Sequence, residues 1–384
     1  DNTWTHFNVW DPPNSFGVDG LTPIDWNIAE ISTDINSGTR FEDRTILLGL
    51  ISDSGTLTMD GTTDMTTGTG TGQGLWITHY LKLDGVIDLE GESQLIQKEY
   101  TDTQASESIL EATSSGHIER DQQGQGNMFN YDDWSSPVGL IGQPQSDKYS
   151  VWDVLKDGRN SYGDNITFTT NHDGDMSTFP ITVSSRWIYS YKNGSGFKRA
   201  NLERVFNAGE GNLMKGSFTT AEALIHKQNF VYKGKPHNGD IQLPISNGNY
   251  YSLGNPYPSA LDADQFIIDN AINNTTITGV LEFYEDWSTD ETHIQSTASA
   301  GYGYYTLAGG VGAGDNINNP GESGDKLPTR YIPVGQAVQA LLAPECGSLV
   351  EFRLVQKAVP HDLRAGNEFQ LPPDRATGFI REFD

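Results

Sequence analysis

Residues 250–270 read Y-Y-S-L-G-N-P-Y-P-S-A-L-D-A-D-Q-F-I-I-D-N, and the order of residue types in this stretch predicts a corner of the fold. The apolar run 250–253 is typical of a short strand. The Gly-Asn-Pro at residues 254–256 then forces a turn, because proline lacks a backbone donor and restricts the residue before it. The strand must therefore end at a rigid corner.

A short helix is expected directly after this corner. Asp262 is placed to accept hydrogen bonds from the first free amides of a helix, and Gln265 follows at the spacing of a capping box. Asn270 can end the helix after about two turns. The stretch thus predicts a strand, a turn and a capped helix, which together form a structural corner and not a catalytic loop.

Three ordered segments resemble one family of proteins. They are N-Y-D-D-W-S-S-P-V at residues 130–138, Q-N-F-V-Y-K-G-K-P-H-N-G-D-I at 228–241 and G-N-P-Y-P-S-A-L-D-A-D-Q-F at 254–266. The segments are similar to those of large secreted and surface proteins of the Bacteroidota that are exported by the type IX secretion system. The resemblance spans about residues 80–355. It implies an extracellular or outer cell-surface location and an adhesin-like role without a defined activity.

The two ends of the chain bear on this resemblance. Proteins of this kind usually end in a sorting domain that is cleaved at the surface, and no segment after Glu368 resembles one. The sequence starts with polar and aromatic residues typical of a mature protein, without a signal peptide. We therefore expect either a processed mature chain or a fragment.

The chain is strongly acidic. Its 24 Lys and Arg against 51 Asp and Glu give a net charge of −27 over 384 residues. Such a field repels phosphate backbones and attracts divalent cations or basic partners, so no nucleic-acid partner is expected. The same charge also favours solubility at a crowded surface. No run of about 18 apolar residues occurs, so no membrane insertion is expected.

A single cysteine, Cys346, excludes an internal disulfide framework and argues against a structural zinc site. Short apolar runs rich in Val, Ile, Tyr, Phe and Trp, with 42 glycines and few helix-length periods, indicate an all-β protein. The sequence predicts an antiparallel, jelly-roll-like β-sandwich over residues 126–359. A β-rich, repeat-containing region precedes it at 1–125, and an extended arm follows at 360–384.

Individual elements follow from the apolar runs and the turn residues between them. Strands are expected at residues 181–191, 229–232, 241–245, 250–253, 278–284, 302–307, 331–342 and 349–356. Besides the helix after Asp262, brief helices are expected near residues 109–112, 151–156 and 221–224, and a long loop at 309–325.

The region 1–125 contains an internal repeat. Residues 57–65 and 81–89 share the pattern L-x-[ML]-D-G-x-x-D-[ML] at an offset of 24 residues. Alternating apolar positions broken by Asp-Gly describe a strand, a turn and a strand. Recurrence at a fixed offset is typical of the stacked coils of a β-solenoid, but two similar hairpins in a sandwich give the same pattern. The sequence leaves both interpretations open.

Familiar enzyme patterns are missing or badly placed. The eight histidines never form H-E-x-x-H, and no Gly-x-Ser-x-Gly stands at a strand-to-helix turn. Glu282, Glu285 and Asp286 offer the two carboxylates that a glycoside hydrolase needs. In so acidic a chain, the solvated edge of a strand explains this cluster better.

Calcium is the metal that an acidic extracellular β protein would most readily bind. Asn171, Asp173 and Asp175 place oxygen atoms at positions 1, 3 and 5 of a calcium loop. Met176 stands where such a loop requires glycine, and Thr182 stands where it requires a bidentate glutamate. The first three residues are the candidate calcium ligands.

Aromatic side chains late in the predicted sandwich are candidates for stacking against sugars. They are Trp287, Tyr302, Tyr304 and Tyr305. Because successive residues of a strand point to opposite faces, at least one of these tyrosines is expected to face solvent or a partner. Most of the other aromatic residues are expected to fill the core.

The sequence therefore predicts a non-enzymatic, extracellular protein with a structural or adhesin-like role. Both ends of the chain are extended and aromatic, so a terminal arm can add a strand to the sheet edge of another copy and build a filament. The alternative is that both arms fold back on their own domain. A module that binds surface glycans is the second functional hypothesis, and a hydrolase is the third.

Overall fold

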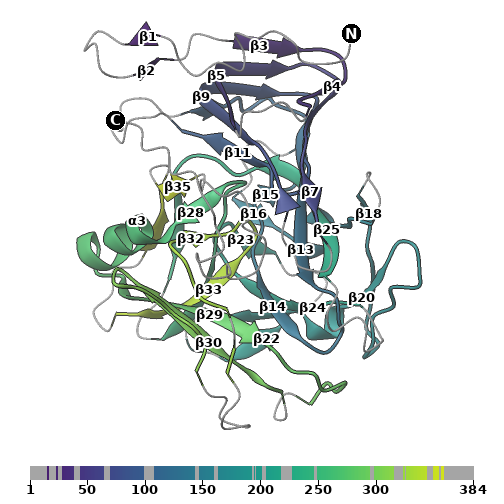
Figure 1. Cartoon of the computed structure of the whole chain (residues 1–384), viewed down its shortest axis with the longest axis vertical. Helices are drawn as coiled ribbons and strands as arrows, with labels where there is room; N and C mark the ends of the chain where they lie inside the picture. Colours follow the sequence, from purple (N-terminus) through teal and green to yellow (C-terminus); the bar gives the residue numbers. More distant parts are fainter. Residues whose placement is uncertain are drawn as a thin grey trace.

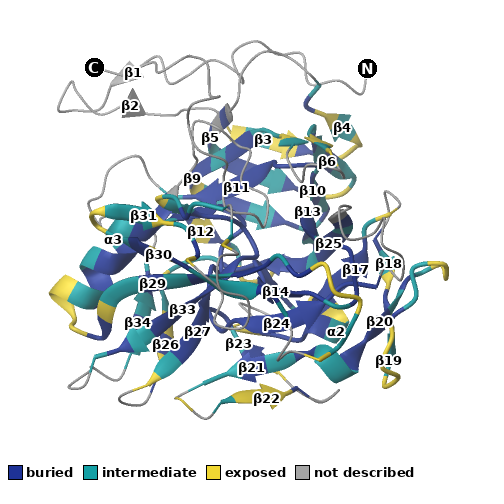
Figure 2. Cartoon of the chain, turned by 60° about the horizontal axis from the view of Figure 1, so that its bottom comes forward, coloured by how far each residue is buried: buried dark blue, intermediate teal, exposed yellow. Residues whose placement is uncertain are grey.

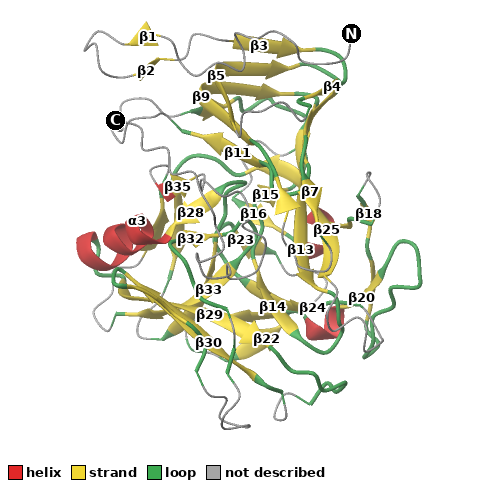
Figure 3. Cartoon of the chain, viewed as in Figure 1, coloured by secondary structure: helices red, strands yellow, loops and turns green. Residues whose placement is uncertain are grey.

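The protein is all-β, as its composition predicts. The structure is a computed structural model in which strands account for 53% and helices for 7% of the described residues, with the strands arranged in several sheets as a sandwich-like fold (Figure 3). It describes residues 15–16, 23–24, 28–38, 44–64, 70–98, 108–142, 147–159, 163–192, 194, 196–200, 205–217, 227–245, 249–294, 298–314, 323–324, 326–343, 349–353 and 356–358. The helix predicted at 221–224, Cys346 and the arm at 360–384 lie outside these residues.

Parallel strands stack in two sheets at the N-terminal end of the fold (Figure 1). The first sheet has the order β11 (Gln94–Gln97), β9 (Gly74–Leu83), β5 (Arg44–Ser52) and β3 (Ile28–Ile31), with β12 (Ile109–Leu110) also paired to β9. The second contains β4 (Ile35–Asn36), β6 (Thr56–Met59), β10 (Val86–Leu89) and β13 (His117–Gln125). The chain alternates between the two sheets, so each pair of strands is one coil of a β-solenoid.

This stacking confirms the solenoid interpretation of the internal repeat. Leu57 lies opposite Ile87, and Ile87 lies opposite Ile118, in one buried column. The two copies of the repeat are not equivalent positions of successive coils, as the 24-residue offset implied. Leu81 belongs to the other sheet, where it lies opposite Leu50. An Asp-Gly turn follows a strand at two different corners of the coil, so the two segments look alike without being equivalent positions.

One corner of the solenoid is closed by a column of glycines. A Cβ atom added to Gly116 would lie 2.0 Å from the carbonyl oxygen of Gly85, and one added to Gly85 would lie 2.6 Å from that of Gly55. Amides of successive coils also donate across this corner, from His117 to the Gly85 oxygen at 3.2 Å and from Val86 to the Gly55 oxygen at 2.9 Å. The coils therefore approach too closely here for any side chain.

The second sheet of the solenoid continues into the rest of the molecule. The last coil strand, β13, pairs antiparallel with β25 (Lys227–Pro236). The sheet is extended by β17 (Leu155–Asp157), β18 (Asp164–Asn165) and β15 (Val138–Gly139). A parallel stack thus ends on an antiparallel strand within one sheet.

Buried apolar side chains form two clusters. One extends from Ile31 to Tyr232 and the other from Leu243 to Phe352. Both the eight-stranded sheet and the first cluster run across residue 125, where the sequence placed a boundary. The division into domains remains a prediction.

The sheets of the sandwich part are antiparallel except for one short pair, β19 (Thr167–Thr169) with β20 (Thr182–Ser184). One has the order β27 (Tyr250–Gly254), β33 (Ala337–Leu342), β29 (Ile277–Asp286), β30 (Ala300–Thr306) and β31 (Gly309–Val311), and another has the order β14 (Tyr131–Trp134), β24 (Asn212–Lys215), β21 (Tyr189–Tyr191) and β22 (Phe197–Arg199). Figure 2 shows β24, β27 and β33 largely buried and β22 exposed.

Short strands and helices complete the fold. The remaining antiparallel strands are β26 (Ile241–Pro244) with β34 (Leu349–Phe352), β28 (Ala260–Asp262) with β32 (Tyr331–Ile332) and β35 (Lys357–Ala358), β16 (Lys148–Tyr149) with β23 (Phe206–Asn207), β7 (Thr62–Thr63) with β8 (Gly70–Thr71), and β1 (Ser15–Phe16) with β2 (Pro23–Ile24). A parallel pair joins β19 (Thr167–Thr169) and β20 (Thr182–Ser184). The helices are α2 (Val151–Val154), the 3-10 helix η1 (Ser185–Trp187), α3 (Ala263–Ile267) and the π-helix η3 (Ile268–Asn273). Among the described residues, no helix is long and apolar enough to cross a membrane.

Two predicted strands are divided in the structure. Residues 181–191 form β20, η1 and β21, and residues 331–342 form β32 and β33 with a turn at Gly335, whose φ is +72°. The helix predicted at 109–112 was wrong, because its first residues pair with β9 as β12. The loop predicted at 309–325 was wrong at its start, where β31 pairs with β30. Pairing with the distant β9 outweighs local preference in the first case, and a tight hairpin with the preceding strand explains the second.

The corner at residues 250–270 has the predicted order of elements. Asp262 caps α3 by accepting from the amides of Asp264 and Gln265 at 3.0 and 3.4 Å. The capping box was wrong, because the Gln265 side chain donates to Asp269 at 3.0 Å and does not reach back to the cap. The cap itself is confirmed.

The predicted end of this helix at Asn270 was wrong. The chain continues as η3 to Asn273. The Asn270 amide donates to the carbonyl oxygens of Phe266 and Glu351 at 3.0 and 2.8 Å, and its oxygen accepts from the Glu351 amide at 2.7 Å. This buried side chain links the helix to β34 by hydrogen bonds to the backbone of Glu351, and it does not end the helix as expected.

The three segments that carry the family resemblance meet at one buried junction. The His237 amide donates to the Pro137 oxygen at 3.0 Å, and its Nδ1 donates to the Pro256 oxygen at 3.1 Å. The Tyr257 hydroxyl donates to the Gly239 oxygen at 2.8 Å. Burial lowers the pKa of His237 to about 4, so its ring is neutral at physiological pH. These bonds connect all three segments.

Asn255 lies at the centre of this junction and is 1% exposed. Its side-chain amide donates to the carbonyl oxygens of Ser259, Ile332 and Pro333 at 2.8, 3.2 and 3.0 Å, and its oxygen accepts from the Tyr257 amide at 3.0 Å. One side chain thereby satisfies four buried backbone groups, which would each be costly if left unpaired.

The junction also holds the solenoid in place. The Leu95 amide of β11 donates to the Pro258 oxygen at 2.9 Å, and the Ala260 amide donates to Oε1 of Gln94 at 2.8 Å. Solenoid, sandwich and helix therefore share one set of hydrogen bonds at the corner.

Gly116→Ala is expected to destabilise the protein by about 1–3 kcal/mol, because the new methyl group would overlap the backbone of the neighbouring coil. Gly314→Ala is the matched control, since a Cβ atom there would have no atom within 4 Å. Urea unfolding of both variants gives the free energy of unfolding. Equal losses in the two variants would contradict the close contact between coils.

Candidate functional site

A tyrosine-rich surface lies on one face of the sheet that contains β29 and β30. In the register of these strands, Glu282 lies opposite Tyr304 and Tyr284 lies opposite Tyr302. Alternate residues of a strand share a face, so all four side chains project from the same side of the sheet. Their neighbours Leu281, Phe283 and Tyr305 project from the other side into the core.

Two neighbouring strands complete this surface. The hydroxyl of Tyr250 on β27 donates to Oε1 of Glu282 at 3.0 Å. The side-chain amide of Gln339 on β33, which lies opposite Glu282, donates to the hydroxyl of Tyr302 at 2.9 Å. The two bonds fix one carboxylate and one phenol in position.

Three phenols lie near Glu282, because Tyr250 donates to it, Tyr304 lies opposite it and Tyr302 is affected by its charge. We refer to these three and the adjacent Tyr191 as the tyrosine cluster. Tyr191 comes from the other antiparallel sheet and lies close enough to act electrostatically on Tyr250 and Tyr302. Tyr304 is 42% exposed, and the other three are half-buried. Burial first, and neighbouring acids second, raise the pKa of Tyr250 and Tyr302, so both phenols keep their protons at neutral pH.

A buried acid lies beneath the cluster. Asp133 on β14 is 2% exposed, and neither oxygen of its carboxyl group has a hydrogen-bond partner in the structure. Trp134, the next residue, packs on Phe230 at 5.3 Å between ring centroids, so Asp133 points to the opposite face, where it acts on Tyr302. Burial raises the pKa of Asp133 to about 8, and the group is therefore mostly protonated at neutral pH.

A second aromatic group borders the cluster on β14 and β24. Lys215 Nζ lies 4.3 Å from the ring centroid of Tyr131 and 4.7 Å from that of Trp187. Trp187 stacks on His293 at 4.6 Å between centroids. Burial lowers the pKa of Lys215 to about 8, with Asp286 opposing the shift. These contacts bind η1 and the segment after β29 to the sheet of β14.

Residues 42–353 match the family DUF8693, a domain of unknown function. The chain belongs to this family. The matched residues include every strand that contributes to the tyrosine cluster. No curated protein and no solved structure matches the chain. Any inference about a ligand must therefore come from the site itself.

The structure brings together two of the four predicted glycan-stacking residues. Tyr302 and Tyr304 belong to the cluster. Tyr305 is 5% exposed on the core face, and Trp287 lies beyond the end of β29, half-buried, with its ring near Gly301. No local pattern in the sequence marks Tyr250 as a member of the cluster, because its bond to Glu282 joins strands that are distant in the chain.

The three acids suggested for a hydrolase do not provide two carboxylates that face each other across one site. Glu282 belongs to the cluster, whereas Glu285 projects from the opposite face of β29 and is 3% exposed. Asp286 accepts from the amides of Tyr131 and Ser288 at 3.1 and 3.2 Å, and burial raises its pKa to about 6. Glu282 and Glu285 therefore cannot flank one glycosidic bond.

The candidate calcium ligands turn toward separate partners. Asp175 accepts from the amide and hydroxyl of Ser177 at 2.8 and 2.6 Å, and Asp173 Oδ1 lies 3.0 Å from Nε2 of His293. The Asn171 carbonyl accepts from Ser184. Within the described part of the chain, no three His, Cys, Asp or Glu side chains are grouped to hold a metal. Calcium binding remains a prediction.

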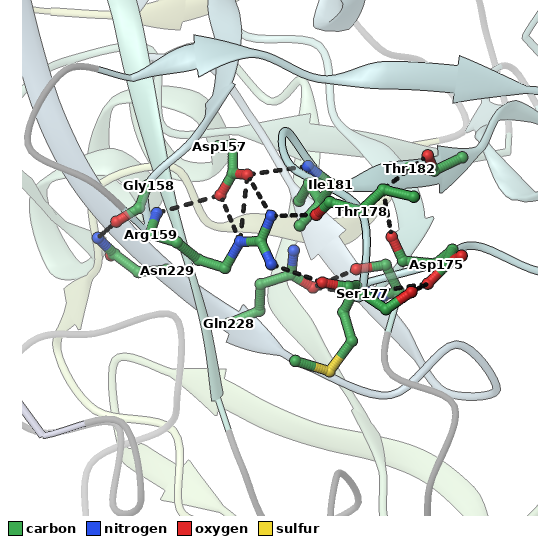
Figure 4. A network of polar contacts seen from close by, with 12 residues as sticks. Asp157, Gly158, Arg159, Asp175, Ser177, Thr178, Ile181, Thr182, Gln228 and Asn229 are labelled. Atoms are coloured by element: carbon green, nitrogen blue, oxygen red, sulfur yellow. Dashed lines mark hydrogen bonds and ion pairs between the residues drawn. The ribbon is translucent and has the colours of Figure 1, made fainter.

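Arg159 explains the shape of the loop that carries Asp175 (Figure 4). Its guanidinium donates to the Asp157 carboxylate at 2.8 Å and to the carbonyl oxygens of Met176 and Thr178, each at 2.6 Å. Asp157 also accepts from the Ile181 amide at 2.9 Å. One ion pair thus anchors both sides of the loop to β17.

Asp133→Asn is expected to flatten the dependence of stability on pH. The raised pKa means that the protonated Asp133 stabilises the fold; this contribution is complete below the unfolded pKa of about 4 and is lost as the pH rises through about 8. Between pH 5 and pH 8, the free energy of unfolding should fall by up to about 1.4 kcal/mol per pH unit more steeply in the wild type than in the variant.

Urea titrations at several pH values measure this difference. Asp290→Asn, at an exposed acid, is the control and should keep the wild-type slope. Identical slopes for the wild type and Asp133→Asn would show that Asp133 does not titrate as its burial implies.

Proposed function

We propose that the protein is a non-enzymatic, adhesin-like protein of the extracellular surface that binds glycans through its tyrosine cluster. The observation that carries the proposal is the carboxylate of Glu282, which accepts from Tyr250, lies opposite the exposed Tyr304 and acts on Tyr302. Aromatic rings can pack against the apolar faces of sugars, and carboxylate, amide and phenol groups can bond to their hydroxyls.

The framework around the cluster suits such a role. The cluster is built on strands of two sheets and not on loops, so its side chains are held in fixed positions. The resemblance to surface proteins of the type IX secretion system supports an extracellular location. The acidic surface is compatible with solubility at a crowded cell boundary.

Tyr304→Ala is expected to weaken glycan binding about tenfold, because the variant loses the most exposed ring of the cluster. A glycan array with the wild type first identifies ligands, and calorimetry then compares the variants. Tyr331→Ala is the matched control, since Tyr331 is a half-buried tyrosine on β32 in another sheet. Failure of the wild type to bind any glycan, or equal losses in both variants, would refute the proposal.

A filament subunit is the second candidate function. Among the strands of the described residues, β3 pairs with β5 alone and β4 with β6 alone, so the first coil has outer edges that can accept another strand. Open edges of this kind are used for strand addition. A terminal arm that binds the next copy in this way would build an open polymer.

Deleting residues 1–16 or 366–384 is expected to abolish filaments if a terminal arm joins the copies. Electron microscopy of the purified protein, with and without a chelator, shows whether filaments form and whether calcium maintains them. Filaments that persist in both truncated proteins would exclude strand addition by the arms, and dispersed single molecules of the intact protein would exclude a filament subunit.

A further inference from the structure

Glu282 gives the tyrosine cluster its negative charge, because the buried Asp133 is mostly protonated at neutral pH. The pKa of Glu282 responds to burial and to the hydrogen bond from Tyr250, and no described lysine or arginine contributes to it. No described residue forms an ion pair with Glu282, whose hydrogen-bond partner is Tyr250. The cluster therefore has a negative potential within a chain whose net charge is −27.

The carboxylate of Glu282 is poorly solvated where it stands. It is half-buried among the phenols, and burial raises its pKa, which Tyr250 only partly offsets by its hydrogen bond. A positive group placed beside Glu282 would restore the lost solvation through a charge-assisted hydrogen bond. The faces of the surrounding tyrosine rings attract the same positive group by cation–π interaction.

Three classes of sugar can be compared at this surface. An acidic sugar would be repelled by Glu282 and by the overall charge of the chain. A neutral sugar can stack on the rings but leaves the carboxylate without a counter-charge. An amino sugar stacks, offers hydroxyls to the phenols of the cluster and places an ammonium beside Glu282.

We propose that the tyrosine cluster selects glycans that contain free amino sugars, with Glu282 binding the ammonium group and Tyr304 packing on the sugar ring. This inference rests on the proposed glycan-binding function and names its ligand class. A lysine side chain would satisfy Glu282 equally well, but it has no ring face to pack on the exposed Tyr304 and no hydroxyl groups for the phenols. The geometry therefore favours the sugar over a basic peptide.

The test compares a glucosamine hexasaccharide with its fully N-acetylated form, by calorimetry at pH 6.5 with the intact chain. The wild type is expected to bind the free-amine form at least tenfold more tightly, and Glu282→Gln is expected to abolish this preference while still binding the acetylated form. Glu282→Asp keeps the charge and should retain a preference. Glu351→Gln, a half-buried glutamate on β34, is the matched control and should behave as the wild type.

The outcomes distinguish the amino-sugar inference from the proposed glycan binding. Equal affinity for the two hexasaccharides, or a preference that survives in Glu282→Gln, would overturn the amino-sugar inference and leave glycan binding intact. Tighter binding of a lysine-rich peptide than of the free-amine hexasaccharide would also overturn it. Binding of no glycan of any charge would refute the proposed function together with the inference. Thermal unfolding of each variant checks whether the substitution leaves the fold intact.

Discussion

The pairing of β13 with β25 is the constraint on which the rest of the fold depends. Each coil of a parallel stack contacts only its neighbours, so the last strand of the stack would have an open edge unless another strand paired with it. The antiparallel ladder from Ile118 opposite Gly234 to Gln125 opposite Lys227 occupies that edge and redirects the chain into the sandwich. The aromatic core beside it, with Trp134 against Phe230, then fills the space between the two architectures.

Local chemistry made part of this fold predictable. The capped helix after Asp262 and the turn at the Gly-Asn-Pro follow from groups within a few residues of each other, and both are present. The solenoid could not be chosen over two hairpins, because the register that aligns Leu57 with Ile87 depends on hydrogen bonds between coils. Asn270 was misread for a similar reason, since its partner Glu351 lies on a distant strand.

The candidate site was predictable to the same limited extent. Tyr302 and Tyr304 stand out because they alternate along one strand, which places them on one face. Asp133 and Tyr250 come from other strands and carry no local pattern that marks Asp133 as a neighbour of Tyr302 or Tyr250 as a neighbour of Glu282. Their roles depend on how two sheets pack, and a single sequence does not report that packing.

The segments that resemble surface proteins meet at the buried junction, whereas the tyrosine cluster is partly exposed. Asn255 and His237 hold the backbone together and have no contact with solvent to offer a ligand. Substitutions at Tyr191 or Tyr304 would alter the surface without changing the hydrogen bonds of the junction. A resemblance carried by these buried segments therefore does not determine the ligand.

The solenoid has a geometric consequence for where the cluster stands. Its coils stack at one strand spacing, about 4.8 Å, and the last coil is bonded to the junction through Leu95 and Gln94. The number of coils therefore sets the distance between the first coil and the sandwich that carries the tyrosines.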